Sequence, residues 1–219
     1  MDILKADHLY RFYHVDDTEV LALRGVSLSL RAGETVAVVG PSGSGKSTLL
    51  NCLAGLDVPD GGHVNVLGKR LSRRSEAERA GVRARHIGIL LQADNLLPTL
   101  SVEENVRLAM RLAHKQDEAY LDALLGQVGL GERRHHRPPQ LSGGETARAG
   151  LAVALATDPD VLLADEPTGE VDVETEAQIL SLLEGRRNRG GAALIVTHSP
   201  TLAGWADRQV ALQDGSVVI

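Results

Sequence analysis

The sequence predicts an α/β fold with a mainly parallel sheet, an antiparallel β element near its start and an inserted helical lobe. The parallel sheet is indicated by three short, continuously apolar runs, each followed by a glycine, acidic or histidine motif: residues 35–39, 161–164 and 192–196. Runs of this kind are typical of strands that are buried on both faces and carry ligand groups at their carboxyl ends.

Two runs that alternate apolar and polar residues predict the antiparallel element. They cover residues 26–30 and 63–67, and an Asp-Gly-Gly turn at 60–62 precedes the second run. Alternation of period two is the pattern of a strand with one buried face. We therefore expect a small antiparallel sheet beside the parallel one.

The helical lobe is predicted from apolar residues at helical spacing between Ser101 and Gly131. Ser101 and Glu104 form the sequence pattern of a capping box, which marks a helix start. The Arg/His/Pro-rich stretch at 132–139 is interpreted as a solvated linker that returns from this lobe. Its adjacent His135 and His136 do not have the spacing of metal ligands on a helix.

Composition limits the function without naming it. The chain has 219 residues, of which 43% are hydrophobic, and this can bury a sizeable core. No apolar stretch reaches the roughly 18 residues of a membrane-spanning helix, and the charged N-terminus does not resemble a secretion signal. The single Cys52 excludes an intramolecular disulfide. A net charge of −6 with 2% aromatic residues argues against a nucleic-acid binder.

A phosphate-binding loop is predicted at residues 40–48, which match the pattern GxxxxGK[ST] between an apolar strand and a helix. Glycines let backbone N–H groups converge on phosphate oxygens, and the helix N-terminus adds positive potential. We expect Lys46 to neutralise phosphate charge and Ser47 to bind Mg²⁺. The predicted nucleotide-binding residues of this loop are Gly40, Ser42, Gly43, Ser44, Gly45, Lys46, Ser47 and Thr48.

Two adjacent carboxylates, Asp165 and Glu166, follow the apolar run at 161–164. Successive strand residues point to opposite sides, so the two are expected to have different roles. We expect Asp165 to hold Mg²⁺ and Glu166 to orient and deprotonate an attacking water. An acidic pair alone would more often be a solvated loop start, but the phosphate-binding loop favours the catalytic interpretation.

The segment Leu141-Ser142-Gly143-Gly144-Glu145 precedes an Ala-rich helical stretch. Its amides and hydroxyl can form a second anion site at a helix N-terminus, although an ordinary helix cap has the same pattern. With the phosphate-binding loop and the acidic pair, this segment makes the chain similar to the nucleotide-binding subunits of ABC transporters, because it resembles their signature motif. The resemblance extends over essentially the whole chain.

The resemblance implies roles for further residues, because their order and spacing also match. Gln92 is at the Q-loop position as a ligand of Mg²⁺ and water, Asp172 is at the D-loop position, and His198 is at the switch position as a γ-phosphate contact. Tyr13 is at the position where the family stacks an aromatic ring on adenine, with Tyr10 and Phe12 as nearby competitors. The cofactors implied are ATP and Mg²⁺.

The family's architecture implies one domain over residues 1–219. A phosphate-loop (RecA-like) core with the antiparallel subdomain would cover 1–92 and 157–219, and a helical subdomain with the signature would cover about 93–156. Ser142, Gly143, Gly144 and Glu145 would act in trans, since each ATP lies between one subunit's Lys46 and the signature of a second copy. A two-fold dimer, most simply a homodimer, follows.

Several segments resemble the lipoprotein-releasing, macrolide-export and cell-division branch of the family, notably 42–50, 55–57, 95–98 and 164–169. This branch implies permease partners of FtsX-like or MacB-like build, no nucleic acid, and a cytoplasmic location at the inner face of the membrane. The alternatives are a soluble ABC ATPase of DNA repair or translation, whose coiled coils and metal modules are missing here, and a non-hydrolysing scaffold, which Glu166 and His198 disfavour. Thr146, Ala147 and Val153 depart from the family pattern and put the turnover rate in doubt.

Overall fold

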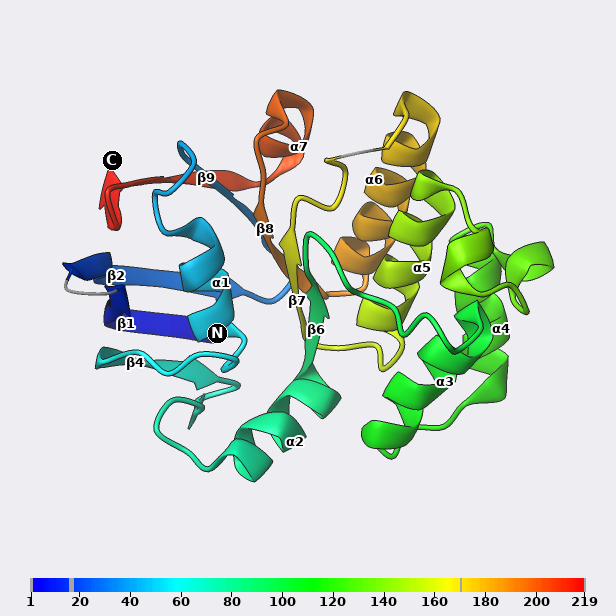
Figure 1. The fold of residues 1–219 in the computed structure, drawn as a ribbon, viewed down its shortest axis with the longest axis horizontal. Coiled ribbons are helices and arrows are strands. Elements are labelled where there is room, and N and C mark those ends of the chain that lie inside the picture. Colours follow the sequence, from blue (N-terminus) through cyan, green and yellow to red (C-terminus); the bar gives the residue numbers. More distant parts are fainter. Residues whose placement is uncertain (1, 16–17, 170, 219) are drawn as a thin grey trace.

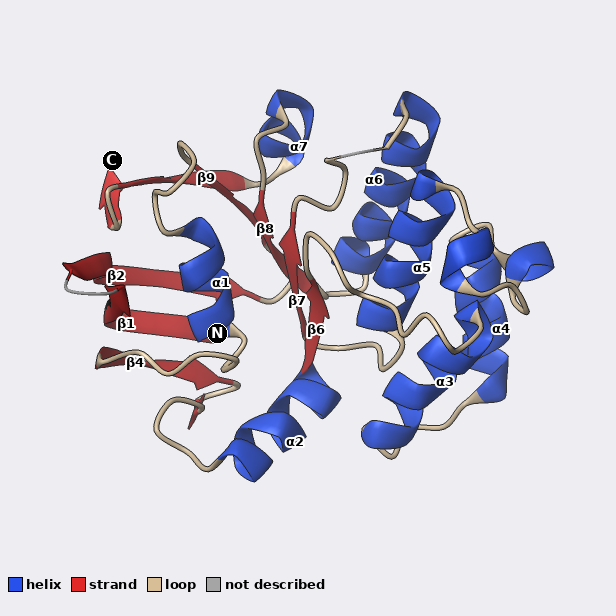
Figure 2. Ribbon diagram, viewed as in Figure 1, coloured by secondary structure: helices blue, strands red, loops and turns tan. Residues whose placement is uncertain are grey.

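The computed structural model describes residues 2–15, 18–169 and 171–218. Figure 1 shows the antiparallel sheet and the helices α3 and α4 at opposite ends of the molecule, with the second sheet between them. In Figure 2 the strands occupy one half of the view and most helices the other. The predicted α/β fold is therefore confirmed.

Four strands form the antiparallel sheet, in the order β2-β1-β4-β5. They are β1 (Asp2–Val15), β2 (Thr18–Arg31), β4 (Gly61–Val66) and β5 (Lys69–Arg70). The two alternating runs of the sequence lie in β2 and β4, and both strands pair with β1. The predicted antiparallel element is thus present.

Six strands form the central sheet, in the order β10-β9-β3-β8-β7-β6. Strands β3, β6, β7, β8 and β9 are parallel to their neighbours, and β10 is antiparallel to β9. Their bounds are β3 (Thr35–Val39), β6 (Ile87–Leu90), β7 (Val161–Asp165), β8 (Ala192–Val196), β9 (Arg208–Gln213) and β10 (Ser216–Val218). The three continuously apolar runs are the central strands of this sheet.

The central sheet separates two apolar clusters, which explains why its strands are apolar on both faces. Leu163 of β7 packs in the cluster that includes the antiparallel sheet, whereas its neighbour Leu162 packs against the helices. Leu194 and Ile195 of β8 divide in the same way. Both sets of side chains are almost fully buried, as parallel sheets covered on both faces require.

The helices are α1 (Lys46–Leu53), α2 (Glu76–His86), α3 (Val102–Leu112), α4 (Glu118–Gln127), α5 (Gly143–Leu155), α6 (Val173–Asn188) and α7 (Pro200–Trp205). Helix α3 begins after Ser101 with the predicted capping box. Helices α3 to α5 lie within the predicted helical subdomain, while the proposed subdomain boundaries themselves stay a prediction. Among the described residues, none of these helices is both long and apolar enough to span a membrane.

The stretch at 132–139 is more than the solvated linker that we expected. The backbone carbonyls of His136 and Arg134 accept hydrogen bonds from the N–H groups of Val102 and Glu103, at 2.9 and 3.0 Å. Arg134 also forms an ion pair with Glu103 at 2.5 Å. The stretch therefore also caps the N-terminus of α3, while none of its residues is buried and most, such as His135, are exposed as expected of a linker.

Candidate functional site

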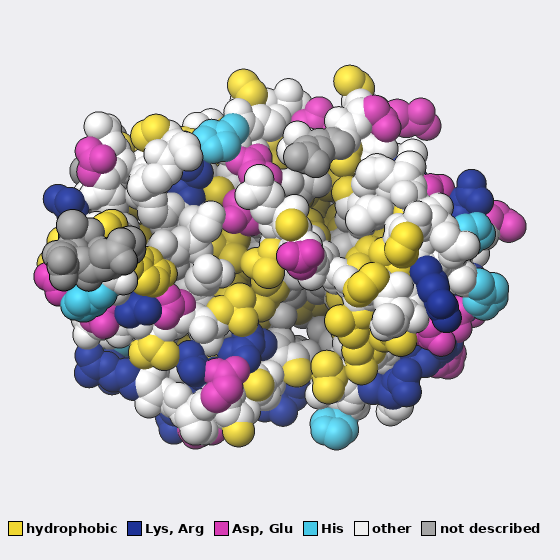
Figure 3. All heavy atoms as spheres, in the orientation of Figure 1, with side chains coloured by type: hydrophobic (Ala, Val, Ile, Leu, Met, Phe, Trp, Pro, Cys, Tyr) yellow, Lys and Arg dark blue, Asp and Glu magenta, His cyan; other side chains and the backbone are white. Residues whose placement is uncertain are grey.

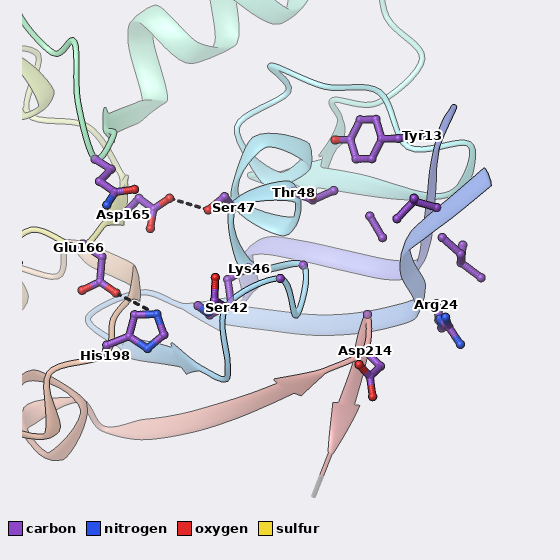
Figure 4. Close-up of a pocket in the computed structure, with 17 residues that line it drawn as sticks. Tyr13, Arg24, Ser42, Lys46, Ser47, Thr48, Asp165, Glu166, His198 and Asp214 are labelled. Carbon is purple, nitrogen blue, oxygen red and sulfur yellow. Dashed lines mark hydrogen bonds and ion pairs between the residues drawn. The ribbon is translucent and has the colours of Figure 1, made fainter. Parts of the chain in front are cut away.

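A cleft of about 800 Å³ lies where strands β3, β6, β7 and β8 of the central sheet end. Figure 4 shows its labelled side chains converging from both sheets. Most of the predicted site residues line it: Tyr13, Ser42, Gly43, Gly45, Lys46, Ser47, Thr48, Gln92, Asp165, Glu166 and His198. Residues that lie far apart in the sequence are thus brought together at one edge of the sheet.

The phosphate-binding loop runs from the end of β3 to the start of α1 and lines this cleft. Lys46 is 7% exposed, and its Nζ donates to the carbonyl oxygens of Gly40 and Pro41, both at 2.8 Å. These contacts hold the ammonium group against the loop. The loop, the ammonium group and the N-terminus of α1 together form a positively polarised cradle for an anion.

Two predicted loop residues, Gly40 and Ser44, are not among the described residues that line the cleft. Ser44 is buried, and its backbone carbonyl accepts a hydrogen bond from Gly215 at 3.0 Å. Gly40 supplies one of the carbonyl groups to which Lys46 donates. Both residues therefore stabilise the loop through these hydrogen bonds.

Ser47 and Asp165 lie side by side in the cleft. The Ser47 hydroxyl donates to Oδ2 of Asp165 at 2.9 Å, and Gln92 lines the same space. Hydroxyl, carboxylate and amide oxygens are the ligands that Mg²⁺ prefers, usually with water and substrate phosphates completing the shell. Nowhere in the described part of the chain do three or more His, Cys, Asp or Glu side chains form a metal-binding group. The residues present therefore fit Mg²⁺ that is shared with a phosphate ligand.

Glu166 follows β7 in the left-handed backbone region, with φ +49°. Its Oε2 accepts a hydrogen bond from Thr197 at 3.2 Å, and its Oε1 is 3.8 Å from Nε2 of His198. Oε1 is buried and has no hydrogen-bond partner among the described residues. One oxygen of this carboxylate is thus held by the protein, while the other can accept a proton or a hydrogen bond from something bound in the cleft.

Tyr13 lies at the opposite end of the cleft from Glu166 and His198 (Figure 4). Its hydroxyl donates to Asp57 at 2.7 Å, and the guanidinium of Arg11 lies 4.6 Å from the centre of its ring. Burial and the Asp57 carboxylate raise the pKa of Tyr13. The competitor Tyr10 does not line the cleft among the described residues, so the site contains the aromatic ring that the sequence analysis favours.

The signature segment lies at the start of α5, away from this cleft. Ser142 caps the helix: its hydroxyl accepts from the Glu145 N–H at 3.2 Å, and Glu145 accepts from the Ser142 N–H at 2.9 Å. Ser142, Gly143, Gly144 and Glu145 are not among the described residues that line the cleft. The helix cap and the anion site that the sequence left as alternatives are compatible, because a capped helix N-terminus still presents free N–H groups.

Asp172 caps α6 by accepting from the Thr175 N–H at 2.8 Å, and this hydrogen bond lowers the pKa of Asp172. Arg148 of α5 donates to the Thr175 hydroxyl at 3.0 Å and to the carbonyl of Val128 at 2.9 Å. The signature helix is thereby connected to the start of α6 and to the end of α4.

Comparisons with known proteins agree with this geometry. A family model described as ABC transporter matches residues 23–169. The chain belongs to the ABC transporter family. It is therefore an ATP-binding subunit of an ABC-type transport system, and an ATPase.

Individual relatives match over nearly the whole chain. A lipoprotein-releasing system ATP-binding protein LolD from Hydrogenovibrio crunogenus is 43% identical over 99% of this chain and 96% of its own length. The macrolide export ATP-binding/permease protein MacB from Hyphomonas neptunium is 40% identical over 99% of this chain and 34% of its own. A dimeric post-hydrolysis structure of the ATP-binding cassette MJ0796, bound to ADP and Pi, matches with a TM-score of 0.94 at 32% identity, over 99% of this chain and 97% of that one.

A second groove of this ABC ATPase, of about 860 Å³, extends from the cleft toward the helices. Gln92, Glu166 and His198 line both spaces, and Leu141 and Gly143 of the signature line only the second. Figure 3 shows apolar side chains gathered beside a hollow between the two halves of the molecule. The edge of the sheet that carries the candidate site thus shares one continuous surface with the helices.

Two asparagines, the half-buried Asn95 and the buried Asn105, support the segment that carries Gln92, and the sequence alone assigns them no role in the site. Asn95 bonds the N–H and carbonyl of Leu91 at 2.8 and 2.6 Å. Asn105, 5% exposed in α3, bonds the N–H and carbonyl of Leu97 at 2.8 and 3.2 Å. A polar residue within the apolar stripe of a predicted helix is the signal that could have revealed Asn105, because buried amides need partners.

Proposed function

We propose that two copies of this chain close around two ATP molecules and drive the permease subunits of an export or mechanotransmission complex. The observation that carries the proposal is a single cleft with Lys46 on a phosphate-binding loop, Ser47 against Asp165, and a Glu166 oxygen that accepts no hydrogen bond from the described residues. The relatives named LolD and MacB favour this branch of the family. They offer no support for a role in DNA repair or translation.

Nucleotide binding is assigned to the two ends of the cleft. Lys46 and the N–H groups from Ser42 to Thr48 are positioned for the phosphates, where the loop and α1 provide positive potential. Tyr13 offers a ring face for adenine, because Arg11 covers one side and Asp57 anchors the hydroxyl. A fixed aromatic platform binds a base with little loss of side-chain entropy.

Mg²⁺ would be held by Ser47, Asp165 and Gln92 together with phosphate oxygens. When bound, the ion supplies neutralisation of charge on the phosphates. The carboxylate of Asp165 is already paired with Ser47 through a hydroxyl hydrogen bond, so the two oxygens are close enough to share one cation. Gln92, which is exposed and lies at the end of the edge strand β6, can join or leave this set as the helices move.

Hydrolysis is assigned to Glu166 as general base and to His198 as a γ-phosphate contact. Oε1 of Glu166 is buried beside the cleft and near His198, where it can accept a proton from a water. A positioned base contributes about 10²- to 10⁴-fold to a rate. In this proposal Asp165 binds the metal ion and Glu166 activates the water.

The signature is assigned to the ATP of a second copy. Ser142 and its neighbours lie outside the phosphate-loop cleft of their own chain, but the N-terminus of α5 has the N–H groups and dipole that bind an anion. A head-to-tail pair would bring this site to the partner's γ-phosphate and would bury Asp172 between the subunits. The dimeric structure of MJ0796 supports the pairing of two copies.

Permease subunits are proposed to dock on the second groove, near residues 92–110, so that closure of the dimer moves them. The chain would then associate with the inner face of the membrane through these permease partners. Leu97, a large hydrophobic residue that is 49% exposed, borders this region and is suited to a protein contact.

The test is a Glu166→Gln chain examined by light scattering with ATP and Mg²⁺. The amide keeps the size of the carboxylate but cannot accept the proton, so we expect intact ATP and a dimer that accumulates, while the unaltered chain without nucleotide is a monomer. Adding Ser142→Arg should abolish the dimer. Ser75→Arg is the matched control, because Ser75 is an exposed capping-box serine on α2. Normal hydrolysis by the Glu166→Gln chain, or a dimer unaffected by Ser142→Arg, would contradict the proposal.

A further inference from the structure

Thr197 is the residue between strand β8 and His198, and its side chain contacts the candidate base. It is 0% exposed. Its backbone N–H donates to the carbonyl of Val38 in β3 at 3.2 Å, which extends the pairing of the two strands beyond Val196. A β-branched side chain on an extended, paired backbone has few accessible rotamers. The position of the Thr197 hydroxyl is therefore set by the sheet.

The hydrogen bonds of this hydroxyl have a fixed direction. The Ser199 N–H lies 3.0 Å from Thr197 Oγ1 and can only donate, so the hydroxyl oxygen accepts there. Oε2 of Glu166 lies 3.2 Å away, and an ionised carboxylate can only accept. The hydroxyl hydrogen of Thr197 must then point to Glu166. This leaves Oε2 anchored to the sheet and Oε1 as the oxygen available to a water.

The need for such an anchor follows from the backbone at Glu166. This residue leaves β7 in the left-handed region, at φ +49°, and its N–H donates to Val196 in β8 at 2.9 Å. The backbone is thus fixed, but a glutamate side chain retains three rotatable bonds beyond it. A hydrogen bond at the far end of the side chain removes most of that freedom, and an error of about 1 Å at a reacting group can cost about 10²-fold in rate.

We propose that Thr197 is a positioning residue for ATP hydrolysis, anchoring Oε2 of Glu166 so that Oε1 faces the attacking water. The inference rests on the proposed role of Glu166 as base. In the step concerned, the water oxygen forms a bond to the γ-phosphorus, the bond from phosphorus to the β,γ-bridging oxygen breaks, and one water proton passes to Oε1. Thr197 is fully buried and is not among the described residues that line the cleft, so it is assigned no direct contact with ATP or the water.

A purely structural role is the competing explanation, because Thr197 also accepts from the N–H of Ser199, the residue that caps α7. Three variants separate the two roles. Thr197→Val keeps the shape and branching but loses the hydroxyl, Thr197→Ser keeps the hydroxyl, and Thr197→Val combined with Glu166→Gln tests whether the effect passes through the base. If the valine variant does not fold, Thr197→Ala takes its place in the same comparisons.

The experiment measures kcat and KM for ATP with Mg²⁺, and the thermal unfolding of each variant. We expect Thr197→Val to lower kcat by about 10- to 100-fold with KM within about twofold, Thr197→Ser to stay within about threefold of the unaltered chain, and the double variant to be no slower than Glu166→Gln alone. A valine variant with kcat within threefold of normal, a change in KM alone, or an equal further loss in the Glu166→Gln background would overturn the proposal.

The same data distinguish this inference from the proposed function. If Glu166→Gln is slow and Thr197→Val is normal, only the anchoring role of Thr197 fails. If Glu166→Gln hydrolyses ATP at the normal rate, the base assignment fails and the anchoring role fails with it.

Discussion

Replacing Gly45 by alanine should destabilise the phosphate-binding loop much more than the same change at Gly43. Both glycines have left-handed backbones, with φ +100° at Gly45 and +77° at Gly43. A Cβ at Gly45 would lie 2.4 Å from the backbone carbonyl oxygen of Ala22, whereas a Cβ at Gly43 meets no described atom within 4 Å. The two substitutions therefore share the conformational cost and differ in the steric one.

The magnitudes follow from these two costs. A left-handed alanine costs about 1 to 2 kcal/mol, and this is the whole expected effect at Gly43. At Gly45 the clash with a backbone atom of β2 adds about 1 to 3 kcal/mol, the range for an overpacked interior site. For a chain of this size, the extra destabilisation lowers the unfolding midpoint by roughly 2 to 12 °C relative to Gly43→Ala.

The assay is thermal unfolding of the two variants without nucleotide, so that changes in ATP binding do not contribute to the unfolding midpoint. Each variant is then tested for ATP hydrolysis, which we expect Gly45→Ala to lose because the loop must shift to relieve the contact. Equal unfolding midpoints for the two variants would refute the steric argument. A Gly45→Ala chain with normal turnover would show that the loop tolerates displacement.

Three further predictions concern charge. Lys46→Ala should abolish hydrolysis and weaken ATP binding in a direct binding assay, because the phosphates lose their principal cation; near-normal turnover contradicts this. Burial alone would raise the pKa of Asp57, but hydrogen bonds from Tyr13 and Arg11 hold it below the usual value. Asp57→Asn should therefore lower the unfolding free energy at pH 7, with a difference from the unaltered chain that shrinks as pH falls below about 4; a difference constant from pH 7 to pH 2 argues against it. Arg133 pairs with Glu145 at 3.0 Å. In light scattering, Arg133→Gln should raise the ATP concentration needed for dimers, because the negative charge of Glu145 is then no longer neutralised beside the signature. A further Glu145→Gln change should return that concentration to its original value. A double variant that still needs the higher ATP concentration would refute this explanation.

The central strands and the phosphate-binding loop could be predicted from the sequence because each depends on local signals. The runs at 161–164 and 192–196 are apolar at every position, and burial of Leu162 and Leu163 on opposite faces of the sheet explains why. The capping box at Ser101 is likewise a pattern within four residues. Local patterns of this kind need no knowledge of the partner element.

Helix α2 could not be predicted in this way. None of its residues, all of them described, is buried, so no apolar stripe marks it. It is held by its own capping box at Ser75 and by ion pairs such as Glu76 to Arg79 at 2.7 Å. The contacts that the stretch at 132–139 makes with α3 could not be predicted for a related reason. Its charged residues resemble a solvated linker, but Arg134 is matched by Glu103 about thirty residues away.

The supports of the site were missed because they depend on the order of strands in the sheet, which the sequence does not reveal. The phosphate-binding loop follows β3, whereas Gln92, Glu166 and His198 come after β6, β7 and β8, and the sheet order is β3-β8-β7-β6. Strand β8, which precedes the candidate residue His198, therefore lies next to β3, which precedes the phosphate-binding loop. A carboxylate at the end of β7 is flanked by β6 and β8, and on the β6 side Gln92 is exposed. The anchor that we propose for Glu166 comes from the β8 side, where Thr197 directly follows the strand and its hydroxyl donates to Glu166.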